Sequence, residues 1–372
     1  MRSLIAFAAA CSSASSAPTT HQSVAPAHDG TTTATQRGSD VVVAQSQLGD
    51  TRITTRIDTV TIIAAVDAGA ASDAPVHARK GETVTLHALL RAGRQYFSDA
   101  RHVLLAGKAI AVRPISEAPA LTLAWSRVEP AAANTSNTQS GTFRFEAIDY
   151  RVTAIAGAVA ASLVADVRPT LTPDHGDGVG TMRYQLVAQQ GDRAIASPGI
   201  DQRRGRGSGG LADAVTRVTM RRDDSYLGFL TEMYGQPYVW ASAGLTDASH
   251  QSERLEGSDC ADLMVYGARR MGKRVAYTWT GGLPGVTKLL TAGTRGDDGI
   301  YRDKAGVALP YPGDGDLVLF TRHVGALAGD HGTKGVLDDA DLVLHTLFDS
   351  PKEQAIKDTG YAHTPVELRR WK

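Results

Sequence analysis

The sequence of 372 residues lacks the features that mark several large classes of protein. It has only two cysteines, Cys11 and Cys260, which excludes a disulfide framework and a zinc site built on paired cysteines. Its 39 basic and 39 acidic residues give a formal net charge of +0, so no overall field attracts nucleic acid. It also has no phosphate-binding glycine loop after a strand and no helix motif of paired histidines. We therefore expect no nucleic-acid partner, no metal and no cofactor.

What is present is a globular composition, with 42% hydrophobic and 21% charged residues, and a length that suits two domains. Changes of composition along the chain predict five segments. These are an export segment at 1–17, a flexible tether at 18–48, a β-sandwich-like domain at 49–200, a linker at 201–218 and a second domain at 219–372.

The first segment has the pattern of an export signal, because Arg2 gives it a positive start and a short apolar run follows from Leu4 to Ala10. Cys11 follows three alanines, which loosely resembles a bacterial lipoprotein cleavage site that lacks the usual leucine three positions before the cysteine. Two outcomes stay open, namely a lipid on Cys11 that anchors the chain to a membrane, or simple removal of the segment. In both cases we expect an extracytoplasmic protein, either periplasmic, membrane-anchored or secreted.

Short stretches of alternating hydrophobic and polar residues run through residues 49–200, and no long helical pattern interrupts them. Such spacing predicts an all-β sandwich, of which the immunoglobulin fold is one form. The alternating positions are Val84, Leu86, Ala88 and Leu90, then Leu121, Leu123 and Trp125, then Phe143 and Phe145, and finally Met182, Tyr184 and Leu186. The glycine- and arginine-rich stretch at 202–210 then predicts a solvated interdomain loop.

Beyond residue 219 two helices precede several strands, an order that indicates an α+β domain. Asp223 or Asp224 is expected to cap the first helix, which Gly235 ends. Ser258 is expected to cap the second helix, which Gly272 ends. The predicted strands are 316–320, 322–327 and 341–348.

Cys260 falls at the start of the predicted second helix. The unpaired N–H groups and the positive end of the dipole at that place favour thiolate over thiol. The same N–H groups can donate to the oxyanion that forms when a thiolate attacks a carbonyl. A buried, inert thiol is the alternative for a lone cysteine.

Two histidines on later strands are candidates for the base that such a nucleophile needs. His323 opens the run His-Val-Gly-Ala-Leu, and His345 lies in the next apolar strand. If these strands are adjacent and antiparallel, one ring takes the proton while the other fixes its tautomer.

The order of short motifs in the second domain resembles that of the NlpC-type peptidoglycan peptidases. The resemblance covers about residues 226–350, and it implies a papain-like α+β fold. It further implies that Cys260 is the nucleophile, His323 the general base and acid, and His345 the orienting residue. The motifs are Gly235–Trp240, Asp259-Cys260, Pro312–Phe320, His323-Val-Gly325 and His345.

The resemblance also implies a substrate, because members of that family cleave peptidoglycan stem peptides, typically between D-glutamate and a diamino acid. Tyr238 matches a tyrosine that lies beside the nucleophile and helps to bind substrate. We assign Trp240 and Asp259, in the same two motifs, to the substrate-binding group as well.

The sequence departs from the family pattern at two places near the nucleophile. Ala261 and Asp262 replace the usual serine and glycine, and Ala241 and Ser242 replace a glycine pair. An acidic group two residues after the cysteine opposes the thiolate if it points inward.

Two alternative functions stay open. A site of this kind also supports amidase or acyltransferase chemistry, since water or another nucleophile can take the acyl group. The second alternative is a catalytically silent protein that binds or organises the cell wall through its β-sandwich domain.

Overall fold

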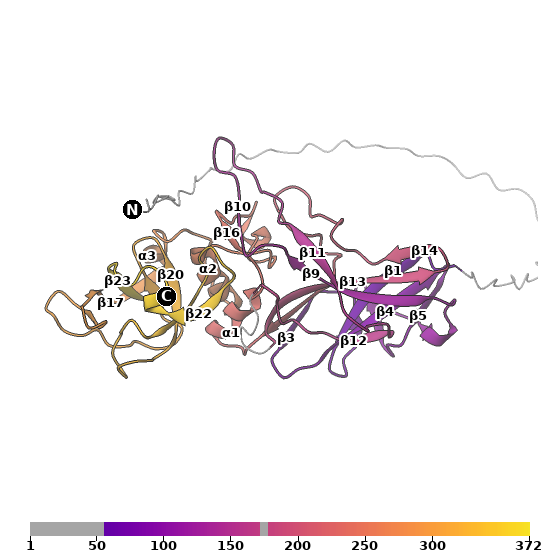
Figure 1. Ribbon diagram of the computed structural model, residues 1–372, viewed down its shortest axis with the longest axis horizontal. Helices are drawn as coiled ribbons and strands as arrows, with labels where there is room; N and C mark the ends of the chain where they lie inside the picture. The colour runs from indigo at the N-terminus through magenta and orange to yellow at the C-terminus, as the bar shows by residue number, and fades with distance from the viewer. Residues whose placement is uncertain (1–55, 172–177) are drawn as a thin grey trace, which may run out of the picture.

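A computed structural model describes residues 56–171 and 178–372. The predicted export segment, the tether and Cys11 lie outside the described residues. Figure 1 shows an elongated arrangement of two lobes, with the indigo to magenta strands in one and the orange to yellow residues in the other. No helix in the described ranges is long and apolar enough to cross a membrane.

The first sheet of the N-terminal lobe has the order β7-β6-β2-β1-β4-β5-β8, with β12 also paired to β4. Its strands are β1 (Thr59–Val66), β2 (Ala71–Ser72), β4 (Val84–Ala92), β5 (Gln95–Ser98), β6 (Val103–Leu105), β7 (Lys108–Ile110), β8 (Arg113–Pro114) and β12 (Ser162–Val164). A 3-10 turn follows β8 at Ile115–Glu117.

The second sheet has the order β11-β9-β13-β15-β3, with β14 also paired to β13. Its strands are β3 (Val76–Arg79), β9 (Thr122–Pro130), β11 (Tyr150–Ala154), β13 (Gly180–Gln190), β14 (Arg193–Ala196) and β15 (Arg217–Arg221). The alternating residues of β4 and β13 meet in one core with Trp125 and Phe97, which explains why period-two patterns located these strands.

Three details of the N-terminal lobe correct the sequence-based expectations. Phe143 and Phe145 belong to no strand, and their rings instead contact each other edge to face at 5.0 Å. The pairs β3–β15, β2–β6 and β5–β8 are parallel, unlike the antiparallel sheets of an immunoglobulin domain. The segment 201–218 is packed rather than solvated, since Leu211 and Val215 are buried and Arg204 forms an ion pair with Glu256.

The C-terminal lobe is built on a sheet of order β18-β17-β23-β19-β20-β21-β22. One face packs on the helices through a core that includes Leu230, Leu263 and Leu283, and a second core lies around Val318 and Leu368. The strands are β17 (Thr287–Arg295), β18 (Tyr301–Arg302), β19 (Leu317–Leu319), β20 (Val324–Gly329), β21 (Leu342–His345), β22 (Lys352–Ala355) and β23 (Val366–Trp371). The helices are α1 (Tyr226–Leu230), α2 (Cys260–Arg270) and α3 (Leu283–Val286), with 3-10 turns at Thr231–Met233, Asp247–Ser249 and Ile356–Asp358.

The expected papain-like α+β fold is wrong, because the structure is mostly β, with 39% strand and 10% helix. The predicted first helix is only five residues long and passes into a 3-10 turn at Thr231. Gly235, with a φ of +79°, then turns the chain away. Within the described ranges only α2 exceeds two turns, so no helical domain faces the sheet.

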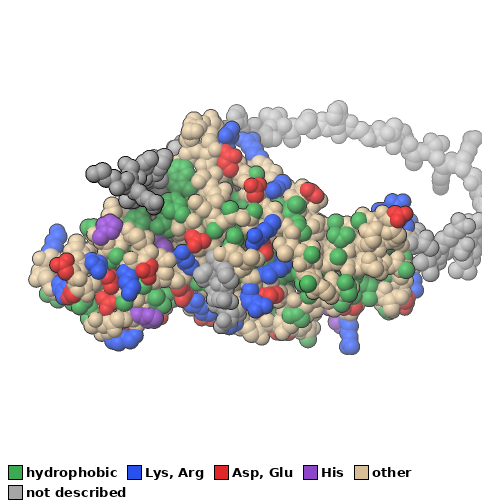
Figure 2. All heavy atoms as spheres, viewed as in Figure 1, with side chains coloured by type: hydrophobic (Ala, Val, Ile, Leu, Met, Phe, Trp, Pro, Cys, Tyr) green, Lys and Arg blue, Asp and Glu red, His purple; other side chains and the backbone are tan. Residues whose placement is uncertain are grey.

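The two lobes are joined by a short parallel pair between β10 (Asn134–Ser136) and β16 (Tyr238–Trp240), which Figure 1 places between them. A buried carboxylate, that of Glu232, adds a second connection: Arg270 of α2 donates to it at 2.9 Å, and His77 of β3 lies 3.6 Å away. Basic and acidic side chains are mixed over the face shown in Figure 2.

Candidate active site

Helix α2 begins at Cys260, as the sequence predicts, but its N-cap is Asp259 rather than Ser258. The Asp259 carboxylate accepts hydrogen bonds from the N–H groups of Ala261 (3.0 Å) and Asp262 (2.9 Å). These two N–H groups are therefore occupied and do not point to an oxyanion, contrary to the expectation for the first turn. The Ser258 hydroxyl instead donates to the Asp259 carbonyl oxygen.

The Cys260 thiol is 5% exposed, and the residues that follow it in α2 are buried through Ala268. Cys260 shares one hydrophobic cluster with Val324 and Leu344, the immediate neighbours of His323 and His345 in sequence. Helix α2 also packs against β20. The start of the helix and the two histidines thus belong to one buried region.

The two histidines form the hydrogen-bonded pair that the sequence predicts. His323 Nε2 lies 2.7 Å from His345 Nδ1, and both side chains are buried. Strands β20 and β21 are antiparallel with Ala326 opposite Leu344, a register that puts His345 opposite Gly325. A Cβ on Gly325 would lie 3.1 Å from the His345 Cβ, so this glycine leaves room for the ring.

Aromatic rings fix the orientation of His323. Its ring stacks on Phe320 at 5.9 Å and on Tyr361 at 5.0 Å, and these two rings also contact each other at 5.9 Å, so the three form one aromatic cluster. Its Nδ1 is buried and has no hydrogen-bond partner among the described residues, and the same holds for His345 Nε2. We assign the shared proton to His323 Nε2, which leaves Nδ1 with a lone pair that can accept a proton.

Both histidines are neutral at physiological pH. Burial, reinforced by the neighbouring His345, holds the pKa of His323 well below its usual range. Burial, reinforced by Lys352, lowers the pKa of His345 to about 4. A neutral imidazole is the form that acts as a base, so the pair is ready to take a proton.

A series of contacts leads from the start of α2 to the histidine strand through Tyr238. The N–H of Val239, next to Tyr238 in β16, donates to the Ser258 carbonyl oxygen at 3.0 Å. The Tyr238 ring lies edge to face on Phe348 at 5.3 Å, three residues after His345. Phe348 is 58% exposed with a φ of +53°, a strained conformation that holds its ring beside Tyr238.

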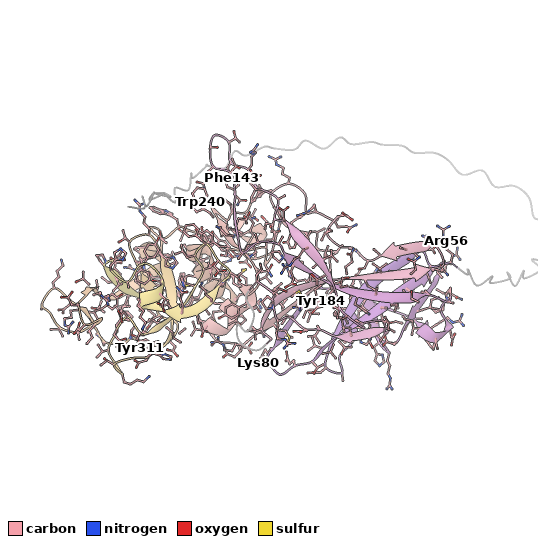
Figure 3. All side chains as sticks on the ribbon, viewed as in Figure 1. Arg56, Lys80, Phe143, Tyr184, Trp240 and Tyr311 are labelled. Carbon is pink, nitrogen blue, oxygen red and sulfur yellow. The ribbon has the colours of Figure 1, made fainter. Side chains whose placement is uncertain are left out.

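The three predicted substrate-binding residues all lie at this start of α2. Tyr238 and Trp240 belong to β16, and Asp259 caps the helix. Trp240, labelled in Figure 3, contacts the other lobe, because its carbonyl oxygen accepts from the Asn137 N–H at 3.1 Å. The buried Nε1 of Trp240 has no hydrogen-bond partner within 56–171 and 178–372.

The two departures from the family pattern contact each other. The Ser242 hydroxyl donates to the Asp262 carboxyl oxygen at 2.5 Å and accepts from the Asp259 N–H at 3.0 Å. Ala241, beside it, has a φ of +56° at a place where the family uses glycine. Asp262 is therefore held towards Ser242.

Burial, with the nearby Asp259, raises the pKa of Asp262 well above its usual range, so this carboxyl is protonated and neutral. Burial also raises the pKa of Asp259, to about 6. A neutral Asp262 does not oppose ionisation of Cys260, which removes the conflict that the sequence suggests.

Sequence patterns gave no sign of a polar cluster behind Asp262. His250 Nε2 lies 3.5 Å from the Asp262 carboxyl, and the His250 ring stacks on Tyr277 at 3.6 Å. Burial lowers the pKa of His250 to about 3, so this ring is neutral, and its Nδ1 accepts a hydrogen bond from the Ser252 N–H at 3.2 Å. His250 lies on no periodic element, and only the fold brings it here.

No group of three or more histidine, cysteine, aspartate or glutamate side chains is placed to hold a metal ion in the described part of the chain. In comparisons with known proteins, no family model, no curated protein and no solved structure matches this chain.

Proposed function

We propose that this chain is an exported cysteine hydrolase that cleaves peptide bonds in bacterial peptidoglycan. The observation that carries the proposal is the buried pair His323–His345, with Nδ1 of His323 open, in the same region as the helix-start thiol of Cys260. Inert core cysteines do not need a neutral, oriented base beside them.

The chemistry follows from the order of these groups. The Cys260 sulfur attacks the peptide carbonyl carbon while His323 Nδ1 takes the thiol proton. His323 then gives that proton to the leaving amine as the C–N bond breaks, and a thioester to Cys260 forms. Water, deprotonated by the same ring, attacks the thioester, and the acid product leaves with regeneration of the thiol. In each step, His345 Nδ1 accepts the hydrogen bond from His323 Nε2 and so keeps the His323 ring in place.

The choice of substrate is supported by the motif order that resembles the NlpC-type peptidases, whose typical bond joins D-glutamate to a diamino acid. Since the papain-like fold expectation is wrong, this support rests on the motifs alone. Tyr238, Trp240 and Asp259 are the residues we propose to contact the stem peptide.

The site of action follows from the export segment at 1–17, and we propose that the protein works outside the cytoplasm. Cys11 is the proposed attachment point of a lipid anchor. Growth with a labelled fatty acid tests this point, since label should enter the wild-type chain and not the Cys11→Ser chain.

The test of the function is the release of new amino groups from purified wall peptides, with mass analysis of the products. Cys260→Ser, which changes one atom, is expected to lose at least about a thousandfold in rate, since a buried serine without a stronger base is a poor nucleophile. Cys11→Ser is the matched control and should keep full activity. Equal activity of wild-type and Cys260→Ser chains would sink the proposal.

The same assay separates the alternatives when an amine acceptor is added. A hydrolase gives only the free acid, whereas an acyltransferase gives the new amide as its main product. A wall-binding protein without activity releases no amine but is retained by insoluble peptidoglycan.

A further inference from the structure

A cavity of about 460 Å³ lies next to the histidine pair. Its lining includes Phe320, whose ring stacks on His323, and Arg322, which directly precedes His323. A volume of this size holds one or two amino-acid residues. The cavity is therefore placed to receive a part of the substrate close to the reacting bond.

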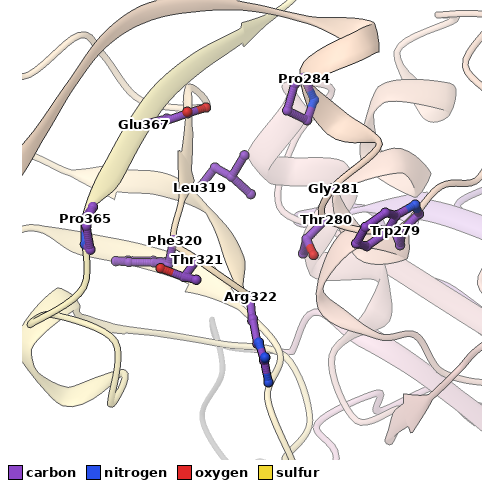
Figure 4. Close-up of a pocket in the computed structure, with 10 residues that line it drawn as sticks. All are labelled: Trp279, Thr280, Gly281, Pro284, Leu319, Phe320, Thr321, Arg322, Pro365 and Glu367. Atoms are coloured by element: carbon purple, nitrogen blue, oxygen red, sulfur yellow. The ribbon is translucent and has the colours of Figure 1, made fainter. Parts of the chain in front are cut away.

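The walls of the cavity are apolar and aromatic. Leu319, Pro284 and Pro365 contribute aliphatic surface, and Trp279 forms a side wall although it is 46% exposed. Figure 4 shows Trp279 and Gly281 on one side, Pro365 and Phe320 on the other, and Arg322 between the two sides.

Gly281 leaves room for the indole of Trp279. A Cβ on Gly281 would lie 2.4 Å from the Trp279 ring, so glycine lets the ring rest against the backbone. An exposed tryptophan in this place offers a ligand a large apolar face.

Among the described residues, the charged side chains that line the cavity leave one unpaired positive charge, that of Arg322. The Glu367 carboxylate is in an ion pair with Arg369, which also donates to Thr287. Arg322 is exposed and has no ion pair or hydrogen bond with any residue that the structure describes. A guanidinium with its donors unused at the mouth of an apolar cavity matches a carboxylate, which it can bind through two parallel hydrogen bonds.

We propose that this cavity is a substrate subsite that selects a residue with a free carboxylate, and that Arg322 binds that carboxylate. The inference rests on the proposed function of the Cys260 site. It assigns to Arg322 a role in specificity and to Trp279 the apolar contact with the body of the same residue. The carboxylate belongs either to the glutamyl residue or to the diamino acid of the stem peptide.

The test is a binding experiment that requires no turnover. Calorimetry on the Cys260→Ala chain, with and without Arg322→Gln, uses three synthetic peptides that contain a D-glutamyl–diamino acid bond. One has both carboxylates free, one is amidated on the glutamyl residue, and one is amidated on the diamino acid. Arg101→Gln, which removes the same charge from an exposed site in the N-terminal lobe, is the control.

We expect Arg322→Gln to weaken binding of the free peptide by roughly threefold to tenfold, the range for a charge-assisted contact open to solvent. One of the two amidations should weaken binding to the chain with Arg322 by the same factor. The same amidation should not weaken binding to the Arg322→Gln chain any further. That amidation identifies which carboxylate is bound.

Three results would overturn the inference. The first is that the loss in affinity from Arg322→Gln and the loss from amidation multiply when both are combined. The others are that neither amidation weakens binding, or that no peptide binds. Failure of the proposed function is distinguishable, because it shows in the release of amine by the wild-type chain and not in this coupling. Arg101→Gln should bind all three peptides as its parent does.

Discussion

At the scale of residues, Asp262 shows how a disfavoured side chain is accommodated close to the proposed nucleophile, Cys260. It hydrogen bonds to Ser242, and each of the two stands where the resembled family has glycine. Neither substitution makes sense alone, since a lone carboxyl would be buried without a donor. Both positions are visible in the sequence but their contact is not, because they lie twenty residues apart and only the fold joins them.

Asp262→Asn tests the protonation of this carboxyl. The native carboxyl keeps its proton above pH 4 whereas the unfolded one releases it, so wild-type stability falls as pH rises through that range. The asparagine has no such proton, and its amide oxygen still accepts from Ser242. We expect the variant to gain about 1.4 kcal/mol over wild type for each pH unit above 5 in which Asp262 stays protonated.

Urea unfolding at pH 5 and pH 8 measures this difference. If wild type and Asp262→Asn change in stability by the same amount between these pH values, Asp262 is ionised in the native protein and the prediction is contradicted. Ser242→Ala should lower stability at both values, since it leaves the carboxyl without its donor.

At the scale of elements, the strands and the helix that carry the candidate site lie within about three residues of the ranges predicted from the sequence. Strands β19, β20 and β21 fall inside or beside the predicted ranges, because each is a short apolar run between turn residues. The cap of α2 was misplaced by one residue, since Ser258 and Asp259 are equally good caps and their side-chain directions decide.

The fit of β20 against β21 gives a prediction on Gly325. Gly325→Ala brings a Cβ to 3.1 Å from the His345 Cβ and should displace the His345 ring. We expect the amine-release rate to fall by about a hundredfold, as small misplacements of catalytic groups do, with little change in stability.

Gly329→Ala on the same strand is the control, because its Cβ would make only ordinary contacts, with His331 at 3.4 Å and Leu342 at 3.6 Å. Its rate should equal that of wild type. If both alanines leave the rate unchanged, the position of His345 does not matter for the reaction.

At the scale of the whole molecule, the assembly of the elements differs from the one predicted from the sequence. Strands β17 and β23 extend the C-terminal sheet, yet their residues show no regular alternation of buried and exposed positions. Pairing such as that of β23 with β19 joins segments about fifty residues apart, which local patterns do not encode. The helical domain of a papain-like fold was therefore expected where a larger sheet forms.

The lobes depend on each other through Glu232. Its buried carboxylate binds Arg270 and Tyr266 of the helix that begins at Cys260, and it lies 3.7 Å from Arg221 of β15 in the other lobe. Glu232→Gln removes the charge and leaves Arg270 facing a neutral amide. We expect a loss of about 3 kcal/mol in the free energy of unfolding, the range for a broken buried pair.

Glu117→Gln breaks the exposed pair with Arg113 and serves as the control, with an expected loss below about 1 kcal/mol. Urea unfolding of both variants at one pH measures these values. Equal, small losses in the two chains would mean that Glu232 does not hold the lobes together.

The central claim is that Cys260 and His323 act as one catalytic unit, and the rate of amine release from wall peptides tests it most directly. The chains to compare are wild type, Cys260→Ala, His323→Ala and the double variant. We expect each single change to remove nearly all activity and the double change to remove no more, because partners in one step do not contribute additively. The claim would be contradicted if either single change lowered the rate only slightly, or if the double variant lost the product of the two single factors.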